Sequence, residues 1–183
     1  MIPYRATQFR CVFGLCYNSA PMEPIRPAPS SSLPAALRPA DPARIQRALA
    51  DFWTELAATA VQIAAQDHLA AHARLARLRN LVLVCMVGLN GADLPTDLDG
   101  NLDGIATLLG PSQRAAIQKT LSVPKATQSA WVGQAVALVV IYRWYTPQLV
   151  EKFGLTYPTQ VESASLTFVG DCLPNWPQSI TSD

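Results

Sequence analysis

The sequence predicts an all-α protein: a bundle of four main helices and a short fifth helix, preceded by a disordered or extended N-terminal lead-in. Half of its 183 residues are hydrophobic, and alanine and leucine, which both favour helices, are frequent among them. Apolar residues recur at intervals of three and four over long stretches, whereas no alternating strand pattern of useful length occurs. Because each helix then has an apolar face to bury, the helices are expected to pack together.

Three segments differ in composition. Residues 1–40 contain "YNSAPMEPIRPAPSSSLPAALRPA", which is rich in proline, serine and alanine and is expected to have little fold. Residues 41–170 are predicted to form the helical bundle domain. Residues 171–183 contain several helix-breaking residues and are expected to be an irregular tail. Met22 is an alternative start, in which case the residues before it play no part in the fold.

The first helix of the bundle is predicted to begin at Pro42, with Asp41 as its N-cap. Its apolar residues recur at helical spacing and form one stripe. This stripe comprises Ile45, Leu49, Phe52, Leu56 and Ile63.

A second helix is predicted to follow after a break near Gln66, because a single helix through the whole stretch would be unusually long. Asp67 is expected to cap this second helix, since aspartate is a favoured N-cap residue. The helix should run to about Leu89, and Gly88 and Gly91 are expected to close it.

The rest of the chain is predicted to contain a turn-rich acidic linker and three further helices. Pro111 opens a short helix after "NGADLPTDLDGNLDG". A long helix should cover about Lys125–Phe153, with a kink at Pro147, which removes a backbone donor and crowds the preceding turn. Gly154 is expected to end it, and Pro158 to open the short fifth helix.

The balance of charge and hydrophobicity excludes several classes of partner. The net charge of +1 leaves no large field that would gather nucleic acid or an anionic membrane. Apolar runs such as "AVALVVIYRWY" fall short of the ~20 residues that cross a bilayer. The N-terminus lacks the continuous apolar core of a signal peptide. We therefore expect a cytoplasmic chain with no membrane partner and no strong nucleic-acid signal.

The cysteines do not indicate a metal site. Cys11, Cys16, Cys85 and Cys172 form no CxxC pair and no zinc spacing. Cys85 lies in an apolar run and is expected to be a buried thiol. Cys11 and Cys16 could form a disulfide in an exported protein, but reduced thiols in a cytosolic protein are the favoured alternative.

Two further stretches resemble metal motifs without completing them. His68 and His72 in "HLAAH" lie one helical turn apart, but a zincin would have glutamate in place of Leu69. Surface or capping histidines are therefore preferred. "DLDGNLDG" resembles the start of a calcium loop, but Leu102 and Leu108 occupy the positions that need a glycine and an acidic ligand. The sequence predicts no metal and no cofactor.

Arginines and aromatic residues are the remaining candidates for binding. Arg74, Arg77 and Arg79 are expected to form a solvated face, with a phosphate or partner contact as the alternative. Trp53 follows Phe52 directly, so we expect one of the pair in the core and the other facing a neighbour, a cleft or water. No phosphate-binding loop and no G-x-S-x-G elbow occurs, and no catalytic residue is predicted.

The order of these features carries a resemblance. An aromatic pair opens "FWTELAATAVQIAAQDHLAAHARLARLR", which has an aspartate at the helix break; "LDGIATLLGPSQRAAIQKTL" follows, and "IYRWYTPQLVEKFGLTYPTQVESASLTFV" contains a GL-x-YP element. Over about residues 43–169 this resembles the C-terminal helical domain of nucleotidyltransferases of the aminoglycoside adenylyltransferase type.

The resemblance implies a function for only part of such an enzyme. In that family a separate α/β domain carries G-S and paired aspartates that hold magnesium, and this sequence has no such motif. What is implied is a detached or truncated substrate-binding domain, inactive alone, that binds a cationic aminosugar and is completed by a separate nucleotidyltransferase subunit. By position, Trp53 and Asp67 match family residues that contact the substrate. From the residues themselves, Tyr142 and Glu151 are added as substrate-binding candidates.

Two alternatives remain. The chain could be a structural or protein-interaction bundle, including a homodimer built on an apolar groove. It could also be the helical toxin–antitoxin partner of a separate nucleotidyltransferase, but the ribonucleases of that kind have an arginine five to seven residues before a histidine, and neither His68 nor His72 has one. Enzymatic activity stays open, although none is predicted for the chain alone.

Overall fold

A computed structural model describes residues 10–12, 15–17, 38–94, 104–121 and 125–177. The chain divides into two units, Met1–Ala35 and Ala36–Asp183. In the first unit, strands β1 (Arg10–Val12) and β2 (Leu15–Tyr17) pair antiparallel, with Cys11 opposite Cys16. The sequence did not predict these strands, because three residues are too few to display an alternating pattern.

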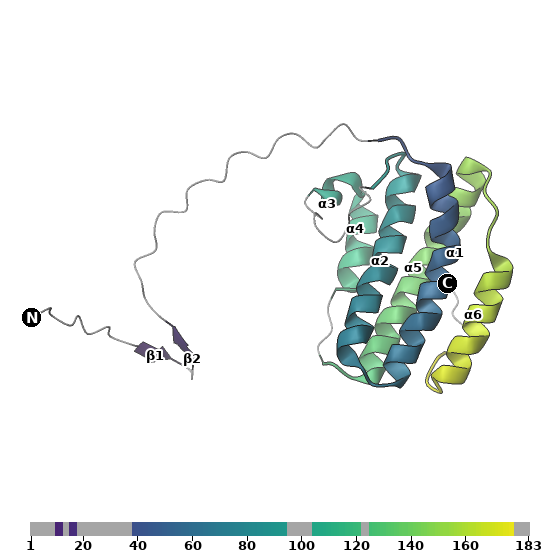
Figure 1. The fold of residues 1–183 in the computed structure, drawn as a ribbon. Helices are drawn as coiled ribbons and strands as arrows, with labels where there is room; N and C mark the ends of the chain where they lie inside the picture. Colours follow the sequence, from purple (N-terminus) through teal and green to yellow (C-terminus); the bar gives the residue numbers. More distant parts are fainter. Residues whose placement is uncertain (1–9, 13–14, 18–37, 95–103, 122–124, 178–183) are drawn as a thin grey trace, which may run out of the picture. The chain divides into compact units, whose positions relative to one another are not determined.

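The second unit is all-α, as predicted. Its helices are α1 (Pro42–Ala64), α2 (His68–Leu89), α3 (Ile105–Leu108), α4 (Pro111–Lys119), α5 (Gln128–Phe153) and α6 (Thr159–Cys172). The long helices α1, α2 and α5 run side by side, and α6 lies along α1 (Figure 1). None of the helices in the described part of the chain is long and apolar enough to cross a membrane.

The predicted start of α1 and the predicted break after it are both confirmed. The Asp41 carboxylate accepts a hydrogen bond from the Ala43 N–H at 3.0 Å and caps α1. At the break, Gln66 adopts a left-handed conformation with φ of 57°. Asp67 then caps α2 by accepting from the Ala70 N–H at 3.0 Å. Local capping chemistry therefore divides the stretch into two antiparallel helices.

The end of α2 differs from the prediction in the role of Gly88. This residue lies inside α2 and is buried, and a Cβ atom added there would lie 2.8 Å from Ile45 Cδ1 of α1. Asn90 is the C-cap residue, and Gly91 follows it with a φ of +88°. Gly88 is therefore a close-approach residue between α1 and α2, and only Gly91 has a backbone conformation that favours glycine at this terminus.

The C-terminal helices follow the predicted order with shifted boundaries. Helix α5 begins at Gln128, where the Thr127 hydroxyl caps it, and continues through Pro147 as one helix. Gly154 ends it in a left-handed conformation with φ of 61°. Helix α6 follows directly after Pro158. The four-residue α3 was not predicted and has no side-chain cap, so its sequence carries little local signal.

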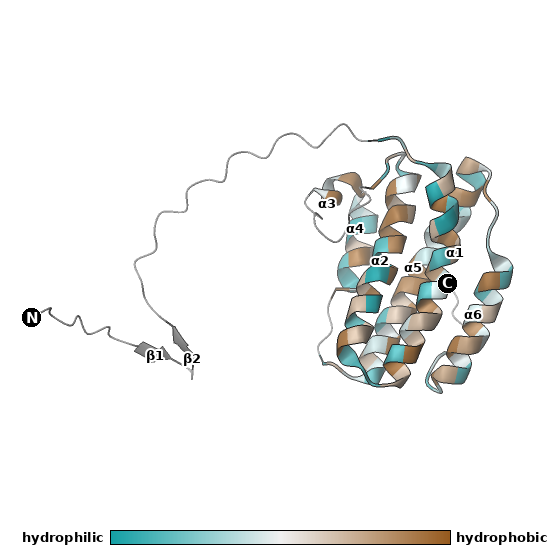
Figure 2. Ribbon diagram, in the orientation of Figure 1, coloured by the Kyte–Doolittle hydropathy of each residue, from teal (hydrophilic) through white to brown (hydrophobic). Residues whose placement is uncertain are grey.

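The core is formed where α1 meets α2, α5 and α6. Figure 2 shows polar and apolar residues side by side along α1 and α2, as expected for helices with one buried and one exposed side. Helix α6 extends beyond the predicted domain boundary to Cys172, and Leu173 and Trp176 after it are buried, 1% and 7% exposed. The described part of the predicted tail thus contributes to the core.

Candidate functional site

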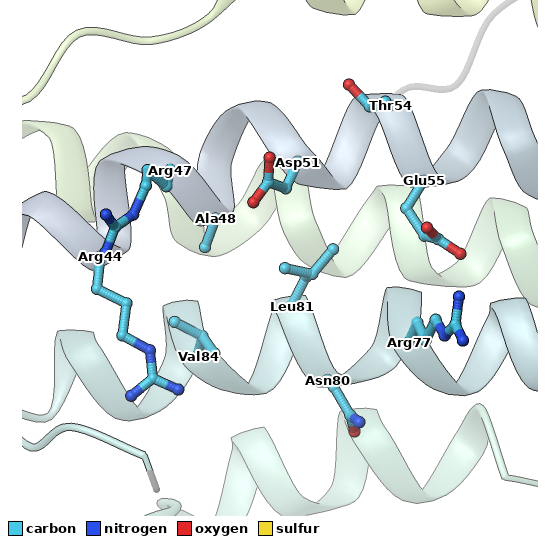
Figure 3. A pocket seen from close by; sticks show the side chains of 10 residues that line it. All are labelled: Arg44, Arg47, Ala48, Asp51, Thr54, Glu55, Arg77, Asn80, Leu81 and Val84. Carbon is cyan, nitrogen blue, oxygen red and sulfur yellow. The ribbon is translucent and has the colours of Figure 1, made fainter. Parts of the chain in front are cut away.

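The helical unit has an open cavity between α1 and α2 and another beside α5. The larger, which we call the α1–α2 groove, has a volume of about 570 Å³ (Figure 3). Helix α1 lines it with Arg44, Arg47, Ala48, Asp51, Thr54 and Glu55. Helix α2 lines it with Arg77, Asn80, Leu81 and Val84. The smaller, the α5 cavity, has a volume of about 330 Å³ and is lined by Pro147, Val150, Glu151 and Tyr157. Both volumes are typical of small-ligand sites.

Charges of both signs line the α1–α2 groove, and some of them are already paired. Arg44 Nη1 lies 2.8 Å from Asp93 Oδ1, and the same guanidinium donates to the Leu94 carbonyl oxygen. Arg74 Nη1, beside the groove, lies 3.1 Å from both carboxylate oxygens of Glu55. The charges of Arg44 and Glu55, the first and last residues of α1 that line the groove, are thus compensated within the chain.

The remaining charges of the groove have no ion-pair partner among the described residues. They are Arg47 and Asp51 of α1 and Arg77 of α2, and all three are exposed. The floor between them is apolar: Ala48 and Val84 are buried, and Leu81 is half-buried. The groove therefore presents opposite charges above a narrow apolar strip.

The α5 cavity has a simpler electrostatic character. Glu151 is exposed at its edge, and the described residues provide it with no ion-pair partner. Tyr157, from the connection between α5 and α6, is half-buried, and burial together with the neighbouring Glu162 carboxylate raises the pKa of its hydroxyl. Glu162 is itself paired with Arg143 at 2.6 Å. One uncompensated carboxylate and one protonated tyrosine thus meet in an apolar cavity.

The four predicted substrate-binding residues occupy different environments. Trp53 and Tyr142 are buried in the core, Asp67 caps α2, and Glu151 lines the α5 cavity. The Tyr142 hydroxyl donates to the Leu49 carbonyl oxygen at 2.8 Å, and burial is the main cause that raises its pKa. Trp53 and Tyr142 contact each other, but the structure does not bring these two residues together with Asp67 and Glu151.

The expectation that only one residue of the Phe52–Trp53 pair lies in the core is wrong. Both side chains are 0% exposed. The Phe52 ring stacks on Tyr142 with centroids 3.9 Å apart, and the Trp53 ring packs edge-on against both at 5.2 Å. Because α1 contacts three other helices, its buried surface is wide enough to include both neighbours. Trp53 therefore lines neither cavity.

The candidate side chains of His68, His72 and Arg79 have partners within the helical unit. Trp131 Nε1 donates to His68 Nδ1 at 3.0 Å, and the His72 ring lies 6.1 Å from the Trp131 ring. Arg79 donates to the Thr120 hydroxyl and carbonyl oxygens at 3.0 and 2.7 Å. No three His, Cys, Asp or Glu residues in the described part of the chain are grouped to hold a metal ion.

The Cys85 thiol has little to contribute as a reactive group. Burial raises the pKa of the Cys85 thiol to about 12, so this thiol stays protonated and unreactive near neutral pH. The carboxylates at 97, 99 and 103 in the calcium-like stretch lie outside the described residues. The described residues thus offer binding surfaces with no assembled nucleophile and base.

The sequence analysis missed two groups that line the cavities. Tyr157 lies in the GL-x-YP element that carries the resemblance, directly before the predicted start of the last helix. Its position could therefore have indicated a candidate binding residue. Arg47 and Asp51 are spaced by four residues on the outer face of α1, and opposite charges at this spacing mark a solvent-facing surface. Their proximity to α2 residues required the tertiary fold.

Comparison with known proteins adds no further identification. No family model matches the chain, and neither the curated proteins nor the solved structures that were searched contain a match.

Proposed function

We propose that the chain is a helical binding module, inactive as an enzyme alone, that binds a cationic aminosugar at the α5 cavity. The observation that supports this proposal is that Glu151 and Tyr157 line one cavity of about 330 Å³. A carboxylate next to an aromatic ring provides the two contacts that a protonated aminosugar needs, an acceptor for its ammonium group and a surface for its ring.

The charges around the α5 cavity favour a cation. Glu162, a carboxylate beside Tyr157, is neutralised by Arg143 at 2.6 Å. Lys152, which follows Glu151, donates to the Leu89 carbonyl oxygen at 2.6 Å and is therefore held by α2. The Glu151 carboxylate thus remains as the charge that attracts a ligand, while Pro147 and Val150 offer apolar contacts.

The buried aromatic residues have a supporting role in this proposal. The Tyr157 ring lies 6.5 Å from the Tyr142 ring, which in turn stacks on Phe52. Tyr142 is thereby a positioning residue for Tyr157, and Trp53 packs behind it. A separate nucleotidyltransferase subunit, as the resemblance implies, would supply the catalytic magnesium site.

Isothermal titration calorimetry with kanamycin-like and streptomycin-like aminoglycosides tests the proposal. We expect heat of binding at high micromolar ligand for the unaltered chain and for Asp171→Asn, which removes an exposed carboxylate on α6. Glu151→Gln is expected to abolish the binding, because it removes the charge and keeps the shape. Absence of heat with the unaltered chain, or equal heat with Glu151→Gln, would contradict the proposal.

A second candidate function is a protein-interaction bundle, and exposed apolar side chains favour it. Leu69 is 87% exposed, Leu121 60% and Trp144 59%, and a partner that covered them would remove apolar surface from water. They lie on α2, after α4, and on α5. Leu69→Ser and Trp144→Ser, tested by sedimentation, would abolish self-association if these side chains mediate it.

A further inference from the structure

The outer face of α1 carries basic residues first and acidic residues after them. Arg44 and Arg47 lie in the N-terminal half of the helix, and Asp51 and Glu55 follow them. The helix macrodipole acts within the first and last turns, where Asp41 already provides an acidic cap, so it does not determine the order of Arg47, Asp51 and Glu55. Contacts outside α1 decide which of these charges are compensated.

Some of these charges are compensated within the chain. Arg44 pairs with Asp93 at 2.8 Å, and Glu55 pairs with Arg74 at 3.1 Å. Arg47 and Asp51 between them have no ion-pair partner in the described part of the chain. Both line the α1–α2 groove, and Asp51 lies beside Ala48 and Leu81 of its apolar floor (Figure 3).

We infer that a second copy of the chain docks on this face, with the two α1 helices antiparallel about a two-fold axis near residue 49. In this arrangement Arg47 of each copy meets Asp51 of the other, because the two positions are equidistant from the axis. The basic half of one α1 then faces the acidic half of the other, so a single surface is complementary to itself.

The groove suits a second copy better than it suits a small ion. Asp51 would repel an anion attracted to Arg47 and Arg77, and the two arginines would repel a cation attracted to Asp51. A partner that presents the same charges in reverse order compensates both Arg47 and Asp51, and an antiparallel copy has that order. Leu81, which is half-buried in one copy, would lie near the axis and become covered.

The association should be weak and salt-sensitive. The charged face from Arg44 to Glu55 extends ~16 Å along the helix at 1.5 Å per residue, which is short for a stable dimer. Ion pairs between exposed groups each contribute little and are screened by salt. We therefore expect a dissociation constant in the micromolar range or above, rising with ionic strength.

Analytical ultracentrifugation of the full chain at concentrations up to about 0.5 mM, at low and high salt, measures this equilibrium. The unaltered chain is expected to show a monomer–dimer equilibrium that shifts toward monomer at high salt. Arg47→Asp and Asp51→Arg should each weaken dimerisation at least ~10-fold, because like charges then meet twice across the axis. Arg114→Asp, an exposed change on α4, should leave it unaltered.

Combining the changes provides the decisive outcomes. The double variant Arg47→Asp/Asp51→Arg should dimerise like the unaltered chain, because the exchanged charges again meet opposite charges. A mixture of the two single variants should form a heterodimer more readily than either variant self-associates alone. A monomer at every concentration, or a dimer that is insensitive to the single changes, would overturn the inference. So would a failure of the double variant and the mixture to restore association in chains that circular dichroism shows to be folded.

Discussion

The α1–α2 groove and the α5 cavity differ in charge more than in size. The groove is larger, about 570 Å³ against about 330 Å³, yet its opposite charges disfavour a small ion of either sign. The α5 cavity has a single uncompensated carboxylate, Glu151, beside Tyr157, and so favours a cation. The balance of unpaired charges, rather than cavity volume, therefore distinguishes a surface that suits a protein partner from one that suits a small ligand.

The largest expected effect concerns the aromatic core that Trp53 forms with Phe52 and Tyr142. Trp53→Ala should lower the free energy of unfolding by about 3–5 kcal/mol, because a fully buried indole is replaced by a cavity. Trp144→Ala, whose side chain is 59% exposed, is the matched control and should change it by less than about 0.5 kcal/mol. Urea denaturation followed by circular dichroism measures both values.

This pair of variants also separates a core role from a ligand role for Trp53. A tryptophan that lined an open cleft would lose ligand binding on substitution and leave stability nearly unchanged. If Trp53→Ala proved as stable as Trp144→Ala, the buried position of Trp53 against Phe52 and Tyr142 would be contradicted, and the ligand role would regain support.

Trp53 also illustrates which parts of the molecule a sequence can predict. Helix starts at Pro42 and His68 followed from caps at Asp41 and Asp67, since a cap and its helix are neighbours in the chain. The burial of Trp53 did not follow, because the stripe rule assumes that a helix packs on one side. Helix α1 contacts α2, α5 and α6, and this wider contact is a property of the tertiary fold.

The cavities were predictable only in part for the same reason. Glu151 was a candidate from the sequence, but its partner Tyr157 lies beyond the end of α5 and reaches the cavity through the turn at Gly154. The groove depends on the antiparallel pairing of α1 with α2. This pairing brings Asp51 and Arg77, which are distant in the sequence, to the same surface.

An intermediate effect is expected at Gly88, where α2 lies close to Ile45 of α1. Gly88→Ala should destabilise the chain by about 1–2 kcal/mol, because the new methyl group overlaps the buried Ile45 side chain. The free-energy cost of this overlap exceeds the gain in helix propensity from glycine to alanine. It should also weaken self-association through the groove and leave aminoglycoside binding at the α5 cavity intact.

The matched control for Gly88 is a glycine in an open part of α5. Gly133 has no heavy atom within 4 Å of an added Cβ, so Gly133→Ala should stabilise the chain by up to about 1 kcal/mol. Thermal and urea denaturation of both variants give the comparison. Equal gains in stability would show that α1 and α2 do not approach closely at Gly88.

The smallest expected effect concerns Asp67, at the turn that joins α1 to α2. Asp67→Ala should cost about 1 kcal/mol, because the Ala70 N–H loses its acceptor. Asp67→Asn should be nearly neutral, since asparagine caps a helix as well as aspartate does. The two variants therefore separate the cap from the charge: stability depends on the cap, whereas attraction of a cationic aminosugar would depend on the charge.

Calorimetry with Asp67→Asn decides whether this residue contacts a ligand, as its place in the sequence predicts. Asp67 lines neither cavity, so we expect Asp67→Asn to bind an aminoglycoside as the unaltered chain does, in contrast to Glu151→Gln. If Asp67→Asn lost binding while it kept its stability, the ligand would have to reach the end of the bundle where α1 turns into α2. The α5 cavity would then be at most a part of the site, and the acid at the helix break would recover the role that the resemblance gives it.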